Sequence, residues 1–515
     1  MNELNERYYE NPVRRGFYPD PSVLRVGEDY YMVNSTFQYF PAITISHSSD
    51  LVHWKTIGHA ITKNEYLDLS GIADSHGIWA PDISYSGGVY YIFAPLRLNN
   101  PPEGQQAPLR VQLVMKSERP EGPYSKPVLL PVDAIDPSHF VDDDGTHYMI
   151  VPPGINVVKL NDDCSKVLEG PVCVWKGTGK RAPEGPHIFK RGDYYYAVLA
   201  EGGTGYGHSI TEARAKNLYG PYEPCPYNPV LTQGDPGAKL QRCGHGDLVE
   251  TQNGDWWILY LCGRPSGGNF TTLGRETSLD PVEWTDDGWF LVNRGRGPSE
   301  KQLAPDLPET ACPEAYFDDF DGGSLSPEWE FVRNPDETLY SLTQRPGSFR
   351  IVTGDYGLDS IRSVNTLLRR EEEFQYAASL KLEFHPAAGE KAGLVCYYGL
   401  RNYIECFLTG NGAGNSVILQ ENRNGAVTRL GETAFSGNTV YLRVRVRGQE
   451  RRFYASEDNQ SWNLVGSDPN CTFLSDEGIT QGKHHTGTLV GLFANNGGSG
   501  SRVPADFDWF RYRNE

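Results

Sequence analysis

Short apolar runs that contain a pair of aromatic side chains recur five times in the first part of the chain. The pairs are Tyr30 and Tyr31, Tyr90 and Tyr91, His147 and Tyr148, Tyr194 and Tyr195, and Trp256 and Trp257. Each unit has two apolar runs, rich in Tyr, Val, Ile and Trp and joined by a Gly or Asp turn, which is typical of a β-hairpin. Repetition at roughly 50 to 60 residues indicates a propeller or a solenoid. Because these runs favour strands over helices, the pattern predicts a five-bladed β-propeller.

The pattern changes after Trp289. The stretch VNRGRGPSEKQLAPDLPETACPE has turn formers and charges but no sustained apolar period, which predicts a linker. Later runs such as QYAASLKLEF and TVYLRVRVRG alternate apolar and polar positions without paired aromatics, as in an antiparallel β-sandwich. We therefore expect an all-β chain, with a propeller domain over residues 1–312 and a sandwich domain over residues 313–515.

The composition fits this architecture and narrows the partners. A chain of 515 residues is too long for one ordinary core, and 56 glycines with 36 prolines suit many turns. The net charge of −19 argues against nucleic acid or an anionic membrane as a partner, whereas a neutral sugar is compatible. The sequence leaves homo-oligomerisation open.

The expectations for localisation and for cysteine chemistry both rest on features that the sequence lacks. The first residues form no apolar signal segment and no run is long enough to cross a bilayer, so we expect a cytoplasmic protein. The nine cysteines include no Cys-x-x-Cys pair, which argues against zinc binding and a disulfide scaffold and favours buried free thiols.

Each of the five repeats has an acidic residue about ten positions before its aromatic pair. These residues are Asp20, Asp82, Asp136, Glu184 and Asp247. A propeller places the first strand of every blade beside one central channel, so we expect these carboxyl groups to converge there. Carboxylates that converge in a cleft raise one another's pKa values and divide into acid and base roles. Taken singly, each of these acids could equally be an ordinary turn residue.

Eight strings, in order, resemble glycoside hydrolase family 43, the β-xylosidase and α-L-arabinofuranosidase group with an appended β-sandwich. They are FYPDPS, FQYFPAITISHSSDLVHW, GIWAPDISY, IDPSHF, EGPHIF, AEGGT, GHGDLV and LGRET. The resemblance spans almost the whole propeller, and the second domain resembles the jelly-roll, concanavalin-like sandwich of two-domain members. It implies inverting hydrolysis of a glycosidic bond.

The resemblance assigns roles to three of the five acids. Asp20 would be the general base that activates water, and Glu184 the general acid that protonates the departing oxygen. Inversion requires about 6.5 to 9.5 Å between the two carboxyl groups, so that water fits between them. Asp136 would lie near Glu184 and keep it protonated by its negative charge. Asp82 and Asp247 share the repeat position but have no catalytic counterpart in the family, so we expect them to be structural.

The resemblance also implies a sugar pocket, because sugar rings have apolar faces and polar rims. Phe37, Trp79 and Ala80 would form the wall, and Thr204, His245 and Arg275 would bind hydroxyl groups. In two-domain relatives a sandwich loop closes the pocket with an aromatic residue in a string like FTGAFVG. The comparable string here is HHTGTLVG, which places His485 at that position. We expect an exo-acting enzyme, because a pocket closed at one end admits only a chain end.

The chemistry expected here needs no cofactor, but two calcium sites are conceivable. His245 matches a histidine that in many relatives faces Ca²⁺ or water in the channel, although Ca²⁺ prefers six to eight oxygen ligands. A second set of acids could meet where the first and last strands of the sandwich lie together. These are Asp318, Asp319, Asp321, Asp506 and Asp508.

Release of terminal β-D-xylose from xylooligosaccharides is the leading expectation, with α-L-arabinofuranosidase, or both activities, as the alternative. A carbohydrate-binding protein without catalysis is less favoured, because it should have lost one of Asp20, Asp136 and Glu184. A retaining fructosidase shares the five-bladed propeller but carries N-D-P-N-G and R-D-P strings, where this chain has Y-P-D-P-S and I-D-P-S.

Overall fold

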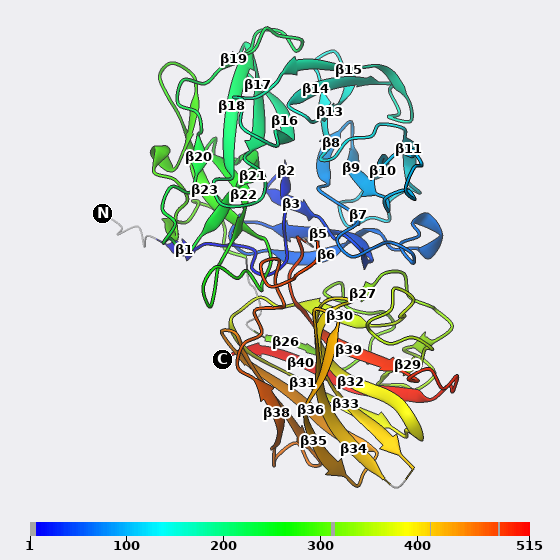
Figure 1. The fold of residues 1–515 in the computed structure, drawn as a ribbon. Helices are drawn as coiled ribbons and strands as arrows, with labels where there is room; N and C mark the ends of the chain where they lie inside the picture. The colour runs from blue at the N-terminus through cyan, green and yellow to red at the C-terminus, as the bar shows by residue number, and fades with distance from the viewer. Residues whose placement is uncertain (1–6, 311–314, 413, 483–484) are drawn as a thin grey trace.

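The chain folds into two all-β domains in a computed structural model that describes residues 7–310, 315–412, 414–482 and 485–515 (Figure 1). Within these ranges the only helical segments are two short 3-10 turns, η1 (Asn64–Tyr66) and η2 (Asn293–Gly295). The all-β prediction is confirmed, and the described residues include no helix long and apolar enough to cross a membrane.

The propeller consists of five antiparallel sheets, which we number as blades 1 to 5 in chain order. Blade 1 contains β2 (Ser22–Val26), β3 (Asp29–Asn34), β5 (Ala42–Ser48) and β6 (Lys55–Ile61). Blade 2 contains β7 (Gly77–Ile78), β8 (Asp82–Ser86), β9 (Val89–Arg97), β10 (Arg110–Ser117) and β11 (Val128–Leu130). Blade 3 contains β12 (Ser138–Val141), β13 (His147–Val151), β14 (Ile155–Leu160) and β15 (Val167–Trp175).

The chain continues through two more blades and then closes the ring. Blade 4 contains β16 (Glu184–Arg191), β17 (Tyr194–Glu201), β18 (Ser209–Ala215), β19 (Glu223–Pro224) and β20 (Leu231–Thr232). Blade 5 contains β21 (Gln241–Glu250), β22 (Trp256–Gly263), β23 (Glu276–Trp284) and β24 (Phe290–Val292). Strand β1 (Tyr8–Glu10) pairs with β25 (Lys301–Leu303), which fastens the start of the propeller to its end.

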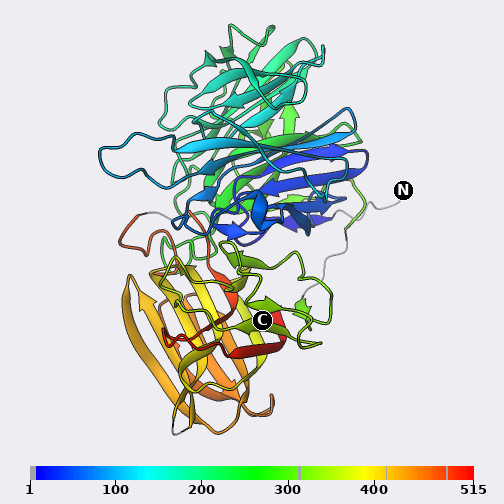
Figure 2. The ribbon, with the colours of Figure 1, turned by 90° about the vertical axis from the view of Figure 1, so that its right-hand side faces the viewer.

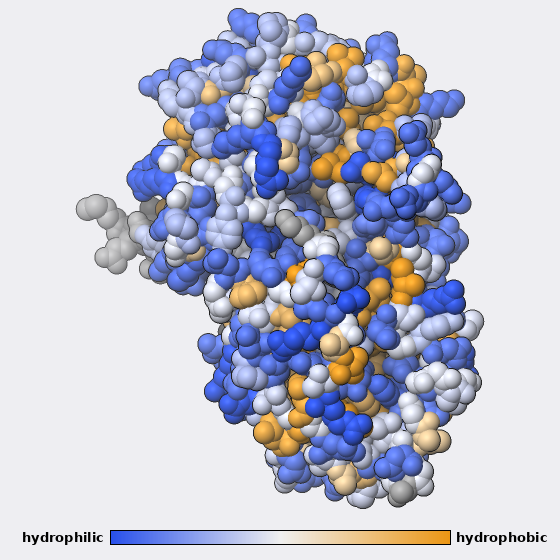
Figure 3. Space-filling view, viewed as in Figure 1, coloured by the Kyte–Doolittle hydropathy of each residue, from blue (hydrophilic) through white to orange (hydrophobic). Residues whose placement is uncertain are grey.

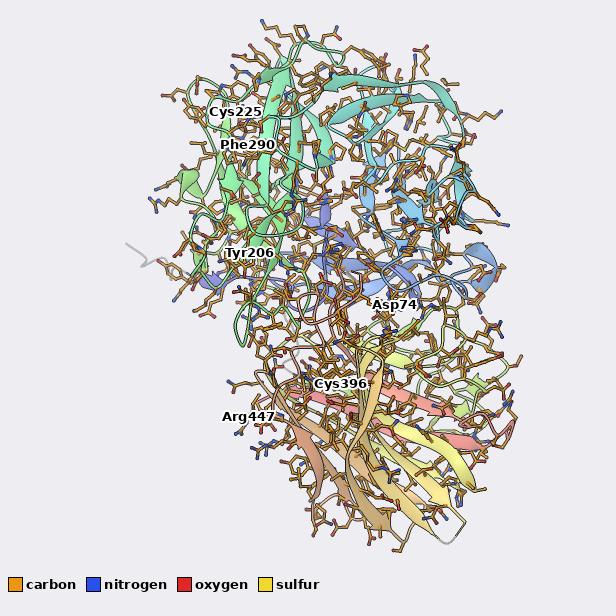
Figure 4. All side chains as sticks on the ribbon, viewed as in Figure 1. Asp74, Tyr206, Cys225, Phe290, Cys396 and Arg447 are labelled. Carbon is orange, nitrogen blue, oxygen red and sulfur yellow. The ribbon has the colours of Figure 1, made fainter. Side chains whose placement is uncertain are left out.

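The first strands of the blades surround the central channel. Strand β2 packs against β8 and β21, β12 packs against β8 and β16, and β16 packs against β21. The apolar residues of adjacent blades form shared clusters. Cys225 and Phe290, for example, belong to one cluster between blades 4 and 5 (Figure 4).

Strand register shows which channel residues are equivalent. On the strand that carries each aromatic pair, the residue two positions after the second aromatic lies opposite one residue of the blade's first inner strand. These opposite residues, in blade order, are Ser22, Asp82, Ser138, His187 and Asp247. We call these five residues the inner ring. The sequence-based equivalence of Asp82 and Asp247 with Asp20 is therefore wrong by two residues. Side chains two residues apart point to the same face of a strand, so these two acids lie in the channel but one step deeper. In blade 4 the register also selects Tyr195 and Tyr196 as the pair, not Tyr194 and Tyr195.

A second set of channel residues lies just before the inner ring along the chain. We call it the mouth ring, and it comprises Asp20, Ala80, Asp136, Glu184 and His245. Glu184 is three residues before His187, where the other members precede their inner-ring residues by two. A register shift between Glu184 and His187 compensates for the extra residue, and blade 5 has a similar shift between Gly244 and Gly246. Such bulges redirect side chains and are frequent beside active sites.

The second domain is a sandwich of two eight-stranded sheets. One contains β26 (Ala315–Asp318), β28 (Tyr340–Ser341), β29 (Phe349–Val352), β31 (Gln375–Phe384), β36 (Thr439–Arg447), β37 (Glu450–Ser456), β38 (Asn463–Asp468) and β40 (Pro504–Asn514). The other contains β27 (Glu330–Val332), β30 (Leu367–Arg370), β32 (Ala388–Gly399), β33 (Asn402–Asn411), β34 (Asn415–Arg423), β35 (Ala426–Phe435), β39 (Leu489–Asn495) and, from the propeller, β4 (Tyr39–Phe40). The inward-facing residues of both sheets form one continuous apolar core.

The two domains are joined by strand pairing and by buried ion pairs. Strand β4 of the propeller extends a sandwich sheet by pairing with β27. Arg370 binds Glu330 and also donates to the Thr44 hydroxyl of the propeller. Asp74 lies at the same junction, where it pairs with Arg333 at 2.8 Å (Figure 4). Figure 2 shows the propeller seated on one end of the sandwich.

Seven of the eight cysteines in the described ranges are buried, as the sequence predicts. The eight cysteines within the described residues are free, and only Cys173 is exposed, whereas Cys312 lies outside the described residues. The face drawn in Figure 3 is mainly hydrophilic, with small, separate hydrophobic groups.

Candidate active site

A pocket at the mouth of the propeller brings together all ten residues that the sequence suggested. They are Asp20, Phe37, Trp79, Ala80, Asp136, Glu184, Thr204, His245, Arg275 and His485. Two more residues line the same pocket, Ile135 and His208, and the sequence did not suggest either. Nine of the ten predicted residues belong to the propeller, and His485 comes from the sandwich.

The backbone of the mouth ring is held in an uncommon conformation. Asp20, Asp136 and His245 have φ angles of 53°, 44° and 46°, in the left-handed region that non-glycine residues rarely adopt. Gly185 has a φ of 56°, and a Cβ atom there would lie 3.0 Å from the His245 ring. Strain of this kind gathers at functional sites, because the surrounding structure must enforce it. It turns these side chains from the blades toward the pocket.

Asp20 is prepared to be an anion. Arg275 donates to its Oδ1 at 2.9 Å, and the Ser35 hydroxyl donates to its Oδ2 at 2.6 Å. Burial pushes the pKa of Asp20 up, but Arg275, His245 and Ser35 together outweigh burial, so the pKa is lowered. A carboxylate that is buried, ionised and adjacent to a pocket can accept a proton from water.

Glu184 and Asp136 are shifted in the opposite direction. Burial, together with the negative charge of Asp20, raises the pKa of Glu184 to about 7. Burial and the charges of Glu184 and Asp20 raise the pKa of Asp136 well above its usual value. Glu184 and Asp136 therefore interact unfavourably when both are ionised, and the charge of Asp20 adds to the effect on both. Asp136 also accepts the backbone N–H of Gly185 at 3.1 Å and so steadies the bulge that carries Glu184.

One wall of the pocket is aromatic. The rings of Phe37 and Trp79 lie 6.2 Å apart, and the Trp79 indole N–H donates to the Ser75 carbonyl at 2.8 Å, which fixes the ring. The Arg275 guanidinium lies 5.5 Å from the centre of the Phe37 ring. An apolar wall beside fixed polar groups is the usual form of a sugar pocket.

In the described part of the chain, three atoms of pocket-lining residues are buried without a hydrogen-bond partner, Thr204 Oγ1, His208 Nε2 and His485 Nδ1. His485 Nδ1 lies 3.5 Å from Asp476, which leaves Thr204 Oγ1 and His208 Nε2 for a ligand. His208 Nδ1 lies 3.0 Å from the Arg242 carbonyl and must donate to it, so Nε2 of the neutral ring is an acceptor. Burial lowers the pKa of His208 to about 3, so the ring stays neutral. An unpaired buried polar atom is costly, and a ligand hydroxyl at these two atoms would remove that cost.

His208 could have been suspected from the sequence, since it lies only four residues beyond Thr204 in the glycine-rich string GGTGYGHSI. Its part in the pocket depends on a tertiary contact, because the Arg242 carbonyl decides which ring nitrogen faces the cavity.

The residues around His245 do not fit a calcium ion. Burial lowers the pKa of His245 to about 4, and its Nδ1 lies 3.8 Å from Asp20 Oδ1. Asp20 already accepts from Arg275 and Ser35, and one imidazole cannot replace the oxygen ligands that Ca²⁺ requires. His245 instead packs under the site as a neutral ring.

The inner ring is the better donor set for a hard cation. Ligand atoms of Asp82, His187 and Asp247 lie within 4.8 Å of one another. Burial raises the pKa of Asp82 to about 6, with His187 opposing and Asp247 adding to the shift. Two carboxylates and several waters would suit Ca²⁺ as a structural ion, with no part in bond cleavage.

The acids of the sandwich do not fit a calcium site. Arg345 and Arg350 both donate to Asp506, and Lys381 donates to Asp508. Asp318 accepts from the indole of Trp329 at 2.8 Å. These carboxylates serve as ion-pair and hydrogen-bond partners and form no shared oxygen cluster in the described ranges.

The loop between β38 and β39 reaches from the sandwich toward the propeller (Figure 1). His485 in this loop lines the pocket. Its backbone N–H donates to Asp476 at 2.7 Å, and its carbonyl accepts from Arg275 Nε at 3.2 Å. Glu477 of the same loop forms an ion pair with Arg242 and accepts the Thr271 N–H at 2.9 Å. The sandwich therefore supplies a wall of the pocket and also supports Arg275. The sequence suggested His485, but not the anchors Arg242, Asp476 and Glu477.

Comparison with known proteins places the chain in a family. The family model for glycosyl hydrolases family 43 matches residues 9–290, and that for the β-xylosidase C-terminal concanavalin A-like domain matches residues 317–513. The chain is 36% identical to a xylan 1,3-β-xylosidase of a Vibrio species, covering 98% of each chain. It is also 36% identical to a non-reducing end α-L-arabinofuranosidase of Bacteroides ovatus, covering 99% of this chain and 96% of that protein.

A solved structure is closer still. The family 43 protein BlXynB of Bacillus licheniformis is 58% identical, with a TM-score of 0.96, over 99% of this chain and 100% of that one. Together with the propeller, the concanavalin-like sandwich and the three carboxyl groups in one pocket, these matches show that the chain belongs to glycosyl hydrolase family 43.

Proposed function

We propose that the protein is an exo-acting, inverting glycosidase that releases terminal β-D-xylose from xylooligosaccharides. The observation that carries this proposal is the division of ionisation within one pocket. The pKa of Asp20 is lowered, whereas that of Glu184 is raised to about 7. One group is therefore prepared to accept a proton and the other to donate one, as an inverting mechanism requires.

The chemistry needs two proton transfers and no covalent intermediate. A water molecule attacks the anomeric carbon while Asp20 accepts one of its protons, and Glu184 protonates the glycosidic oxygen as that bond breaks. Arg275 and Ser35 keep Asp20 anionic before the reaction through their hydrogen bonds to its carboxylate. Asp136 positions Glu184 through the Gly185 N–H.

The sandwich loop supports exo action. His485 lines the pocket, and its backbone is tied to both domains through Asp476 and Arg275. A pocket closed on that side admits the end of a chain but not its middle. The expected substrate is a small neutral oligosaccharide, which suits a protein with a net charge of −19.

α-L-Arabinofuranosidase activity is the second candidate, either alone or together with xylosidase activity. It is favoured by one observation, the 36% identity to a Bacteroides ovatus protein named for that activity. The two sugars present their scissile bonds and hydroxyls in overlapping arrangements. The residue types of the pocket therefore do not separate them.

Hydrolysis of the two aryl glycosides, 4-nitrophenyl β-D-xylopyranoside and 4-nitrophenyl α-L-arabinofuranoside, tests the proposal. We expect turnover of the xyloside, with NMR showing α-D-xylose as the first product, and background rates for the Glu184→Ala variant acting on xylobiose. Background rates on both glycosides, together with internal cleavage of linear arabinan, would overturn the exo-glycosidase proposal. A first product with the β configuration would overturn inversion alone.

A further inference from the structure

A cluster of two imidazoles and a thiol lies outside the pocket, where blade 3 meets blade 2. It consists of His139 on β12, His147 on β13 and Cys164 in the turn between β14 and β15. His139 Nε2 lies 2.9 Å from His147 Nδ1 and 3.9 Å from Cys164 Sγ. One ligand atom from each of the three residues lies within 4.8 Å of the other two.

These separations suit a tetrahedral ion. With metal–nitrogen bonds of about 2.0 Å and metal–sulfur bonds of about 2.3 Å, ligand atoms in a tetrahedron lie roughly 3.3 to 3.6 Å apart. The 2.9 Å edge is that of a hydrogen bond between the two rings, which an ion would replace, and the 3.9 Å edge is slightly long. The third edge, between His147 and Cys164, is at most 4.8 Å, so side-chain shifts of up to about one ångström would complete one face of the tetrahedron.

Neighbouring groups already orient the central ligand. The Ser84 hydroxyl lies 2.6 Å from His139 Nδ1, so this nitrogen is engaged and Nε2 faces the cluster. The Phe93 ring stacks on His139 at a centroid distance of 4.6 Å, and Tyr91 lies 5.0 Å away. Ligating histidines are normally held in this way, by a hydrogen bond to the ring nitrogen that does not bind the metal.

The surroundings of the cluster favour a cation. Cys164 is near Lys116, Asp162 and Asp163, whose summed charge is −1. The Cys164 thiol is buried and must lose its proton to bind a metal, so binding would release that proton.

We propose that His139, His147 and Cys164 form a binding site for a divalent cation of the zinc class, with a solvent molecule as the fourth ligand. The nitrogen and sulfur donors select such an ion over calcium or magnesium, which prefer oxygen. The ion would tie together two strands and a turn of blade 3. The ion would have no direct part in hydrolysis, because His139 lies outside the pocket although it is only three residues from Asp136 in the sequence. The inference is independent of the proposed substrate.

Titration of the metal-free full-length protein with Co²⁺ tests the site, since Co²⁺ replaces Zn²⁺ and reports its ligands by absorption. We expect one equivalent to bind, with visible bands of tetrahedral cobalt and a near-ultraviolet thiolate-to-cobalt charge-transfer band. Zn²⁺ should abolish both and raise the melting temperature. Cys164→Ser should lose the charge-transfer band and weaken binding by more than about tenfold, since even changes beyond the ligands cost that much.

Two further variants keep the test decisive. Cys173→Ser removes the exposed thiol of the same blade and should leave the spectrum and stoichiometry unchanged. His147→Gln should weaken binding while hydrolysis of an aryl glycoside, used as a check of folding, stays within about twofold of wild type. The absence of a charge-transfer band in the wild-type protein, or its persistence in Cys164→Ser, would overturn the site. Loss of the band in Cys173→Ser would do so as well, by assigning binding to the exposed thiol.

Discussion

The mouth-ring residues lie two or three positions before those of the inner ring, on the first strand of a blade or just before it, yet the side chains of the two rings are used differently. Four of the inner-ring residues contact one another. The Ser22 hydroxyl, which has a single proton, lies 3.0 Å from Asp82 and 3.1 Å from Asp247, and His187 Nδ1 lies 3.7 and 3.5 Å from the same two acids. These contacts join blades 1, 2, 4 and 5 across the channel.

The mouth ring leaves reactive groups facing the pocket. Asp20 accepts hydrogen bonds from Arg275 and Ser35. Glu184 lies at the start of a β-bulge, and its pKa is raised to about 7. Convergence of acids alone therefore does not make a catalytic site. What distinguishes the mouth ring is a left-handed or bulged backbone that aims carboxyl groups at a cavity, where inner-ring acids bind backbone and hydroxyl donors.

Exchanging one carboxylate for an amide in each ring should give the sharpest contrast. Asp20→Asn keeps the shape of the side chain but removes the general base, so we expect kcat on xylobiose to fall by about 10²- to 10⁴-fold. Asp247→Asn is the matched control, because Asp247 holds the Val23 N–H and the Ser22 hydroxyl. That variant should melt several degrees lower and keep kcat within about tenfold of wild type. Equal losses of kcat in the two variants would erase the distinction between the rings.

The cation beside Asp20 should set the acidic limb of the pH profile. Asp20 must be ionised to act as the base, and Arg275 lowers its pKa. In Arg275→Met the pKa of Asp20 should rise by about one to three units, so the acidic limb of kcat/KM moves to higher pH. Arg264→Met is the control, since Arg264 pairs with Glu276 instead. An acidic limb that stays in place in Arg275→Met would mean that another group than Asp20 governs it.

The proton on Glu184 should set the alkaline limb. The pKa of Glu184 is raised to about 7, so the acid is present below that pH and is lost as the pH rises through it. For xylobiose, kcat/KM should therefore fall about tenfold per pH unit above 7. An aryl xyloside with a good leaving group needs less protonation, so its alkaline limb should be shallower. If both substrates show the same limb, proton donation to the leaving oxygen is not its cause.

The sequence predicted the five-fold repeat, but it did not predict how deep in the channel each acidic residue lies. Paired aromatics and strand composition were sufficient to predict five blades, because they reflect local strand preference and burial. They could not show that Asp82 and Asp247 lie with Ser22, since two-residue shifts along a strand preserve the facing direction. The bulge before His187 adds one residue between Glu184 and the inner ring, and nothing in the composition of the chain indicates this bulge.

Within the pocket, the string matches identified every lining residue except Ile135 and His208. What they could not supply was the network behind the pocket. Asp476 and Arg242 come from different domains, and their 3.8 Å pairing exists only once the domains are in contact. The electrostatic roles of Asp20 and Asp136 likewise depend on distances and burial that a linear string does not contain.

Buried atoms without a partner at the polar side of the pocket predict a moderate effect. Thr204 Oγ1 has no hydrogen-bond partner among the described residues, so Thr204→Val should cost nothing in the free protein but lose a bond to the substrate. We expect kcat/KM to fall by about 10-fold, as for loss of about 1 to 2 kcal/mol. The control is Thr211→Val, because Thr211 donates to Glu201 within blade 4 and should affect stability instead. Unchanged kcat/KM in Thr204→Val would remove this hydroxyl from the binding groups.

The sandwich wall should have the smallest effect, and it should act on the leaving group alone. The backbone of His485 binds both Arg275 and Asp476, and its ring Nδ1 also lies 3.5 Å from Asp476 Oδ2. Replacing the side chain therefore removes the ring contact but leaves the two backbone anchors in place. His485 has a φ of 53°, which asparagine adopts more readily than phenylalanine, so His485→Asn isolates the loss of the ring with the least strain. We expect KM for xylobiose to rise a few-fold while the ratio of xyloside to arabinofuranoside hydrolysis stays constant. His485→Phe restores an aromatic wall and should lower KM for aryl glycosides relative to xylobiose. A change in the xylose-to-arabinose ratio in either variant would place His485 against the terminal sugar, and the wall of that subsite would then belong to the sandwich and not to the mouth ring.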